Sequence, residues 1–141
     1  MKISGNMSTD KKDPLDDLIV DKVEFNVNQI LAEILKCKVE ITKEGKINLI
    51  DETLKYPDWK KIIVAMLSRK VIHLKGLVPD YKESAMPRDI EKEALVSNEA
   101  IGKRIARELK GIMDKNEGGY YIPDYRLSKC KVLLENKKNN Q

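Results

Sequence analysis

Hydrophobic residues recur at helical spacing near the start of the chain. Asp13 followed by Pro14 is a helix-start signal, and the apolar stripe behind it predicts a helix over 13–23. A second amphipathic helix is predicted over 26–37, either separate from the first or continuous with it apart from an interruption near Phe25. The residues of this second helix expected to face inward are Ile30, Leu31, Ile34 and Leu35.

The pattern then changes from helical to strand-like. In residues 38–50, apolar and polar residues alternate on both sides of the sequence "KEGK". This alternation predicts a β-hairpin, and Gly45 is expected to supply the positive φ that its turn needs.

The segment 58–77, "DWKKIIVAMLSRKVIHLKGL", has the strongest helical pattern in the chain. Asp58 is its expected N-cap and Gly76 its expected end. A broad apolar face predicts the central core helix, formed by Trp59, Ile62, Ile63, Met66, Leu67, Val71 and Leu74. The cations expected to lie mostly outside that face are Lys60, Lys61, Arg69, Lys70 and Lys75.

Two further helices are predicted close together. A short one covers 87–94 and starts at Pro87, the "LVS" that follows forms a tight break, and Ser97 is the expected N-cap of the next helix, over 97–111. The inward residues of that helix are Ile101, Ile105 and Leu109. Because these anchors fix one side of it, Lys103, Arg107 and Lys110 are expected to point outward, with Arg104 at the flank.

The last third of the chain predicts a turn, a strand and a helix. "NEGG" is a turn signal, and the "YYIP" after it is a short β-prone run. Tyr120 and Tyr121 alternate along that run, so one is expected in the core and the other at the surface. A final helix is predicted over 124–136.

The predicted elements indicate a mostly α (α+β) protein, and the length of the chain fits one main domain with a small appendage. The chain has 141 residues, of which 41% are hydrophobic and 35% charged, enough to bury a core. We expect flexible tails over 1–13 and 137–141, an N-terminal extension of helix and β-hairpin over 14–56, and the main domain over 57–136. The extension either enlarges the core or forms a dimer contact.

The charge of the chain is concentrated near its end. Residues 97–141 carry 10 Lys and Arg against 6 Asp and Glu, whereas residues 1–96 carry 17 of each, so the whole net charge of +4 comes from the last third. A local basic excess is weak support for a polyanionic partner. Scarce aromatic residues, 5% of the chain, argue against stacking platforms for single strands.

Chemistry-bearing residues are few and isolated. Cys37 and Cys130 have no Cys or His at ligand spacing, which predicts two reduced thiols and no zinc site. His73 has no Asp, Cys or Ser at a useful spacing, and no Gly-rich phosphate loop occurs. We therefore expect no enzyme activity and no cofactor. With no apolar run of about 18 residues and no signal core, the expected location is the cytoplasm.

The sequence "IEKEALVSNEAIGKRIARELKGI" resembles the helix-turn-helix of prokaryotic and archaeal winged-helix regulators, and "KNEGGYYIP" resembles the wing hairpin that follows it in that family. The matching positions are Ile90, Val96, Ser97, Ile101, Lys103 and Ile105, within a resemblance that covers about residues 60–123. Glu91, Leu95 and Leu109 depart from the family pattern, and Leu95 stands where the family has a turn glycine. The resemblance implies a winged helix-turn-helix fold, here with extra N-terminal helices and a β-hairpin.

From this resemblance we expect a duplex-DNA-binding protein, most simply a transcriptional regulator. Residues 98–110 would form the recognition helix in the major groove, and the wing would lie near 115–119. The expected DNA-binding residues are Asn98, Lys103, Arg104, Arg107, Lys110, Lys115 and Arg126. Family members often bind as dimers, which makes a homodimer an expected assembly. Several alternatives stay open: a winged-helix module that docks on a protein, a regulator that senses a small molecule, RNA in place of DNA as the partner, and an ordinary solvated polar face on this helix.

Overall fold

The computed structural model describes residues 23–135, and the side chains from residue 27 onward. It is a mixed α+β fold with predominantly helical structure and two small antiparallel hairpins. The predicted helix over 13–23 and both predicted tails lie almost wholly outside the described residues. Among those residues, no helix combines the length and the apolar character that a membrane crossing would need.

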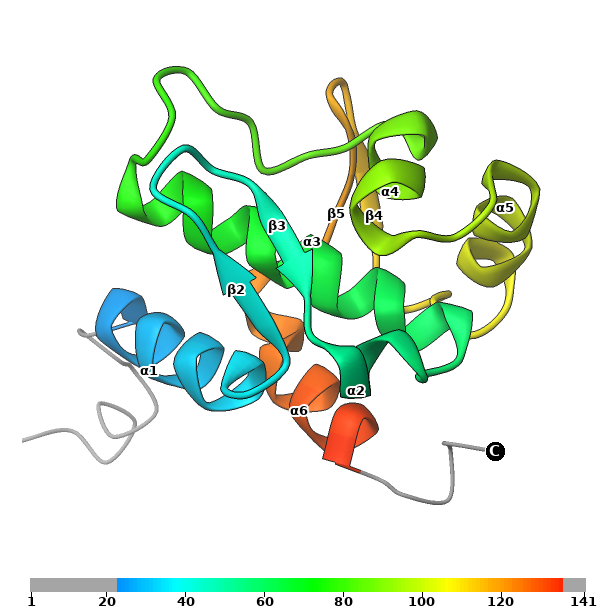
Figure 1. Ribbon diagram of the computed structural model, residues 1–141, viewed down its shortest axis with the longest axis horizontal. Coiled ribbons are helices and arrows are strands. Elements are labelled where there is room, and N and C mark those ends of the chain that lie inside the picture. The colour runs from blue at the N-terminus through cyan, green and yellow to red at the C-terminus, as the bar shows by residue number, and fades with distance from the viewer. Residues whose placement is uncertain (1–22, 136–141) are drawn as a thin grey trace, which may run out of the picture.

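The central element is the helix α3 (Asp58–Lys75), which the other elements surround (Figure 1). On one side lie α1 (Val23–Leu35) and α6 (Leu127–Glu135), which also contact each other. On another side lie α4 (Pro87–Ala94) and α5 (Asn98–Ala106). The core is continuous, because one cluster of buried residues includes side chains from α1, α3, α4, α5 and α6.

Three sequence predictions for α3 were wrong in detail. The N-cap is Pro57, and Asp58 is the first helical residue, without a capping hydrogen bond from its neighbour's side chain. Three of the cations predicted to lie outside its apolar face are instead buried: Lys60, Arg69 and Lys70. Leu74, placed on that face, is 38% exposed. The prediction that Gly76 ends the helix was correct, since it has a left-handed φ of 62°.

The N-terminal part of the described chain forms a helix and then a hairpin. The helix α1 runs through Phe25 without interruption and buries Leu31, Ile34 and Leu35, as predicted. The strands β2 (Val39–Ile41) and β3 (Ile47–Leu49) pair antiparallel, which confirms the hairpin predicted over 38–50. Gly45 has the expected positive φ, at 87°. This hairpin lies against α3 and is followed by the short helix α2 (Asp51–Leu54), which the sequence did not predict.

The second hairpin consists of β4 (Asp114–Asn116) and β5 (Gly119–Tyr121). Ala85, in the segment between α3 and α4, forms an isolated bridge with Tyr120 and so adds a short third row beside β5. After the hairpin, a 3-10 turn, η2 (Asp124–Arg126), leads into α6, so the predicted helix over 124–136 begins as a tighter turn.

Candidate nucleic-acid interface

The turn between α4 and α5 determines where α5 begins. Leu95 has a left-handed φ of 59°, which ends α4 and reverses the chain. Val96 is 3% exposed and holds the turn on the core. The Oγ of Ser97 accepts a hydrogen bond of 3.2 Å from the backbone N–H of Ala100, as expected of an N-cap. The tight break predicted at "LVS" and the predicted cap are therefore both present.

The helix α5 is shorter than the predicted recognition helix over 98–110, because it ends at Ala106. Arg107 leaves the helical region with φ −115° and ψ −92°. Leu109 follows Ile101 by eight residues, so an unbroken helix would turn it about 80° away from Ile101. The break lets both side chains reach full burial in the core, each at 0% exposure. The chain after Arg107 continues as turns, in which the Leu109 N–H donates to the Arg104 carbonyl at 2.8 Å.

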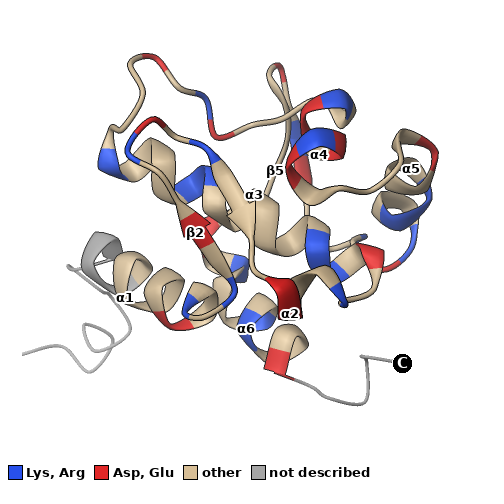
Figure 2. Cartoon of the chain, viewed as in Figure 1, with Lys and Arg blue, Asp and Glu red and all other residues tan. Residues whose placement is uncertain are grey.

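Four of the predicted DNA-binding residues are exposed on α5 and in the turns that follow it. Asn98 and Lys103 lie on the helix, whereas Arg107 and Lys110 lie beyond its end. Lys103, Arg107 and Lys110 form no ion pair with any residue in 23–135. Figure 2 shows that acidic segments interrupt the basic ones along α5, so this surface carries charges of both signs.

Two other predicted DNA-binding residues are engaged within the fold. Arg104 pairs with Glu108 one turn later, at 2.7 Å. Arg126 pairs with Asp114 at 2.8 Å, with its guanidinium 5.0 Å from the centre of the Tyr125 ring. The second pair ties the start of the hairpin to the turn before α6. Both arginines would have to share or exchange a partner to bind a phosphate.

Lys115, the remaining predicted residue, lies on the second hairpin. It is exposed, and its ammonium is 5.4 Å from the centre of the ring of Tyr120, its cross-strand partner. Tyr120 and Tyr121 are both half-buried. Tyr120 packs against the core and Tyr121 lines an open cavity, so the predicted division into a core and a surface side is present, although neither ring is fully buried or fully exposed. Both contribute to a short strand that lies between the core and the surface. Lys115 is thus presented outward by a hairpin of fixed register.

The hairpin is held close to the segment before α4. Ala85 and Tyr120 exchange two backbone hydrogen bonds, of 2.9 and 2.8 Å. Gly119 makes this approach possible, because it has a φ of 123° and a Cβ on it would lie 2.3 Å from the Ala85 carbonyl oxygen. At the tip, the Asn116 Oδ1 accepts a 2.8 Å hydrogen bond from the Gly118 N–H. The position of the hairpin therefore depends on the segment that precedes α4.

The buried arginine of α3 fixes that segment. The Arg69 guanidinium donates to the carbonyls of Lys82, Glu83 and Ser84 at 2.8–3.0 Å, and it pairs with Glu93 of α4 at 2.7 Å. One side chain thus joins α3 to both α4 and the segment that carries Ala85. Sequence periodicity assigned Arg69 to the surface. The signal that could have placed it inside is the unbroken apolar run from Ile62 to Leu67, which leaves the middle of this helix no polar face.

A second buried cation, Lys70, follows Arg69 in α3 and also connects separate segments of the chain. Lys70 of α3 pairs with Asp124 at 2.6 Å and also with Glu83. It therefore connects α3 to the segment before α4 and to the turn before α6. Beside this pair, burial raises the pKa of the Cys130 thiol to about 11, although Lys70 opposes the shift. A thiol of this kind is protonated and unreactive at neutral pH.

Burial also perturbs two groups beside Arg69. It raises the pKa of Tyr81 to about 12 and raises the pKa of the Glu93 carboxyl, with the Arg69 charge opposing both shifts. The Tyr81 hydroxyl and the Glu93 Oε1 are buried without a hydrogen-bond partner among the described residues. These groups lie inside the fold between α3 and α4, and their arrangement is consistent with a structural role.

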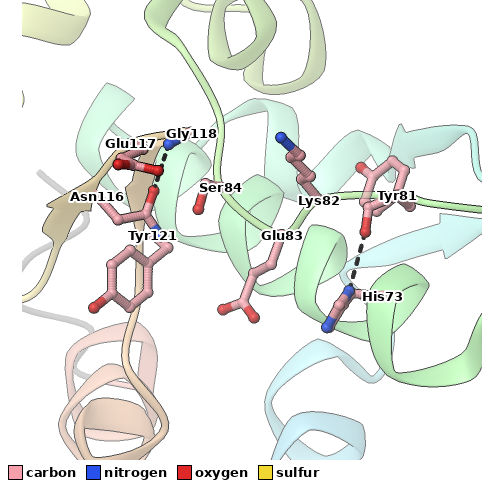
Figure 3. Close-up of a pocket in the computed structure, with 9 residues that line it drawn as sticks. All are labelled: His73, Tyr81, Lys82, Glu83, Ser84, Asn116, Glu117, Gly118 and Tyr121. Carbon is pink, nitrogen blue, oxygen red and sulfur yellow. Dashed lines mark hydrogen bonds between the residues drawn. The ribbon is translucent and has the colours of Figure 1, made fainter.

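An open cavity of about 660 Å³ lies between the β4–β5 hairpin, residues 81–84 and the end of α3. Figure 3 shows that its lining comes from three segments: the end of α3 with His73, residues 81–84, and the hairpin with Asn116, Gly118 and Tyr121. The Glu83 carboxylate in this cavity is already paired with Lys70, and the His73 Nδ1 lies 3.1 Å from the Tyr81 carbonyl oxygen. No group of three or more His, Cys, Asp or Glu within 23–135 is arranged to hold a metal ion.

One feature of α5 was missed at the level of sequence. Gly102 lies in the middle of the helix, is exposed, and would carry a Cβ with no atom within 4 Å. Glycine inside a helix costs about 1 kcal/mol relative to alanine. The available signal was a glycine between the apolar anchor Ile101 and the outward cation Lys103.

Comparison of the chain with protein-family models, with curated proteins and with solved structures finds no match in any of the three. The geometry of this surface offers a short helix of fixed orientation, exposed cations that are free to pair, and a neighbouring hairpin that carries one more cation.

Proposed function

We propose that the protein binds duplex DNA with a winged helix-turn-helix, and that it acts as a transcriptional regulator. The helix α5 enters the major groove, and the β4–β5 hairpin lies against the sugar-phosphate backbone as the wing. The observation that carries this proposal is the position of Lys103 and Arg107. Both are exposed and without an ion pair in the described part of the chain. Lys103 lies on α5 and Arg107 at its end, and this helix is capped by Ser97 and anchored in the core by Ile101.

The order of the elements supports the winged-helix part of the proposal. Along the chain come α3, the bridge at Ala85, α4, α5, β4 and β5. The bridge and the two strands form a small three-row sheet beside the helix pair. This is the order in which a winged helix places its core helix, its first short strand, its helix-turn-helix and its wing.

The chemistry of the surface supports a polyanionic partner. An α-helix fits the major groove of B-DNA, and cations on it reach phosphates or guanine edges. The exposed cations available for such contacts are Lys103, Arg107, Lys110 and Lys115. If they make about 4 phosphate contacts, the logarithm of the affinity should fall with the logarithm of salt concentration at a slope near −3.6.

The test is the binding of a fluorescent 20-base-pair duplex of random sequence, measured by anisotropy at several salt concentrations. The proposal predicts a dissociation constant well below ~1 mM at low salt and a steep salt dependence, because electrostatic attraction alone supplies that much affinity. A dissociation constant above ~1 mM at low salt would contradict it.

A second candidate function is docking on another protein. It is favoured by two exposed leucines, Leu54 at 39% and Leu95 at 59%, which line a cavity of about 260 Å³ together with Ile47 and Leu49 of β3. Exposed apolar side chains around a hollow are typical of protein interfaces. Absence of duplex binding, together with a sedimentation mass above that of one chain, would favour this surface over the DNA-binding one.

A further inference from the structure

A groove on the surface lies between β3 and α4, and β3 is the strand of the first hairpin nearer to α4 (Figure 1). The groove has a volume of about 260 Å³, and two of the leucines that line it, Leu54 and Leu95, are 39% and 59% exposed. Ile47 and Leu49 of β3 also line it and are half-buried. Exposed apolar side chains around a hollow indicate a place where another molecule binds.

Contacts within the fold hold the walls of this groove in place. The hydroxyl of Thr53 is buried and donates to the Lys38 carbonyl at 2.7 Å, which fixes α2 and its Leu54 beside the hairpin. On the other wall, the Leu95 N–H donates to the Glu91 carbonyl at 3.0 Å, in the turn that ends α4. Because the walls are already ordered, a partner that enters the groove loses little affinity to ordering them.

The strand β3 presents an unpaired edge at the groove. The Thr42 N–H donates to the Lys46 carbonyl at 3.0 Å, so Lys46 and, two residues later, Asn48 direct their backbone groups toward β2. In an antiparallel ladder the residues between them direct theirs the opposite way. The N–H and C=O groups of Ile47 and Leu49 therefore face the far edge of β3, where no other strand of the described chain pairs with them. Such an edge is a template for one more strand.

The charges at the groove favour an acidic occupant. The charged residues that line it are Lys46, Lys92 and Glu93. Glu93 is paired with Arg69, whereas both lysines are exposed and without an ion pair among the described residues. Acidic side chains placed beside Lys46 and Lys92 would complement this charge.

The alternation along β3 indicates the sequence pattern of that occupant. Lys46 and Asn48 lie on one face of the strand, and Ile47 and Leu49 lie on the other. A strand that pairs with this edge meets the same alternation, because side chains on one face of a sheet contact one another across strands. Acidic residues would therefore stand beside Lys46, and apolar residues beside Ile47 and Leu49.

We propose that this groove binds an extended segment of a partner protein in which acidic and apolar residues alternate. The main chain of the segment pairs with the free edge of β3, and its apolar side chains enter the hollow beside Leu54 and Leu95. Its acidic side chains pair with Lys46 and Lys92. This inference deepens the second candidate function named above, and it holds whether or not α5 binds duplex DNA.

The first experiment uses the full chain and a fluorescein-labelled hexapeptide of alternating leucine and aspartate, with binding measured by anisotropy. The control hexapeptide has lysine in place of aspartate and should bind about 10-fold more weakly, because it replaces two exposed ion pairs with repulsion. A leucine–aspartate hexapeptide with N-methylated backbone amides should also bind about 10-fold more weakly, because it cannot complete the ladder with β3.

Reversing the charge of the groove should reverse the peptide preference. The double variant Lys46→Glu/Lys92→Glu should bind the leucine–lysine hexapeptide about 10-fold more tightly than the leucine–aspartate one. The matched control, Lys82→Glu/Lys129→Glu, makes the same change of charge at exposed positions outside the groove. This control should keep the wild-type preference.

Leu95→Asn tests the apolar contact without disturbing the turn, because asparagine tolerates the left-handed backbone at this position. It should bind the leucine–aspartate hexapeptide about 10-fold more weakly, with no decrease in Tm. Val132→Asn removes an apolar side chain that is 63% exposed on α6 and should leave the affinity unchanged.

Three results would overturn the inference: no binding of the leucine–aspartate hexapeptide by the wild type at ~1 mM, equal affinity for the acidic and basic hexapeptides, or unchanged affinity in Leu95→Asn. A wild-type sedimentation mass of two chains that falls to one chain in Leu95→Asn would also overturn it, because a second copy would then occupy the groove. Duplex binding is measured separately, and its absence would overturn only the function proposed for α5.

Discussion

Arg69 of α3 and Glu93 of α4 form an ion pair of 2.7 Å in which the two side chains are only 9% and 23% exposed. The same guanidinium holds three consecutive carbonyls of residues 82–84. The contacts of Arg69 therefore determine how the helices α4 and α5 and the β4–β5 hairpin are positioned on α3. The exposed cations proposed to bind DNA are positioned from within the fold, by a cation that is itself buried.

Removing this buried cation should destabilise the protein strongly. Arg69→Met at pH 7 should cost about 3 kcal/mol or more in the free energy of unfolding, because it leaves Glu93 buried and uncompensated. Glu93→Gln should cost less, since Arg69 keeps its three carbonyl partners. Urea unfolding followed by circular dichroism measures both. Equal costs for the two variants would contradict the anchoring role assigned to Arg69.

Tyr81 should make stability sensitive to high pH. Burial raises the pKa of Tyr81 from 10.0 to about 12, so the folded state holds the phenolic proton more tightly than the unfolded state does. The contribution of this proton to the free energy of unfolding is fully present below pH 10 and is lost as the pH rises from about 10 toward 12. In Tyr81→Phe, the free energy of unfolding should therefore fall less steeply with pH between about pH 10 and 12 than it does in the wild type.

At pH 7 the same variant should be close to neutral in stability, because the Tyr81 hydroxyl has no hydrogen-bond partner among the described residues. Urea unfolding at pH 7, 10 and 11 tests both statements. Cys130→Ala is the control, because the pKa of the Cys130 thiol is also raised. Removing this thiol should make the free energy of unfolding fall less steeply at lower pH, between about pH 9 and 11. An unchanged pH profile in Tyr81→Phe would show that Tyr81 does not contribute.

Gly119 should link the hairpin to duplex binding. Gly119→Ala would place a Cβ 2.3 Å from the Ala85 carbonyl oxygen, so the hairpin must move away from the segment before α4. We expect a loss of more than 1 kcal/mol in unfolding free energy and a weaker duplex affinity. Glu117→Ala, at the exposed tip of the same hairpin, is the matched control and should retain stability. Full stability in Gly119→Ala would show that the close approach is not required.

Local signals in the sequence predicted the helix pair well. Pro87, the "LVS" turn and Ser97 act through nearest neighbours, and each lies where the pattern placed it. The first hairpin was predicted for the same reason, from alternation and one turn glycine. These elements are determined by a few adjacent residues, so they can be predicted from the sequence alone.

Features that depend on distant contacts were missed. Arg69 and Lys70 of α3 are buried with partners in residues 82–84 and at Glu93, which lie 13 or more positions away, and helical periodicity does not contain that information. The end of α5 at Ala106 likewise depends on where the core accepts Leu109. In the candidate site, the helical spacing of the apolar residues predicted that Lys103 and Arg107 are exposed. It did not predict the ion pairs of Arg104 with Glu108 and of Arg126 with Asp114.

The most direct test of the account is the salt dependence of duplex binding by the double variant Lys103→Ala/Arg107→Ala. A control double variant, Lys43→Ala/Lys129→Ala, removes the same charge from exposed positions on the first hairpin and α6. Both should keep their stability within about 0.5 kcal/mol, as is usual for exposed side chains. The account predicts that the first variant binds the random duplex much more weakly, with a salt slope smaller by about 1.8, while the control keeps the wild-type slope. Equal slopes for the two double variants would contradict it.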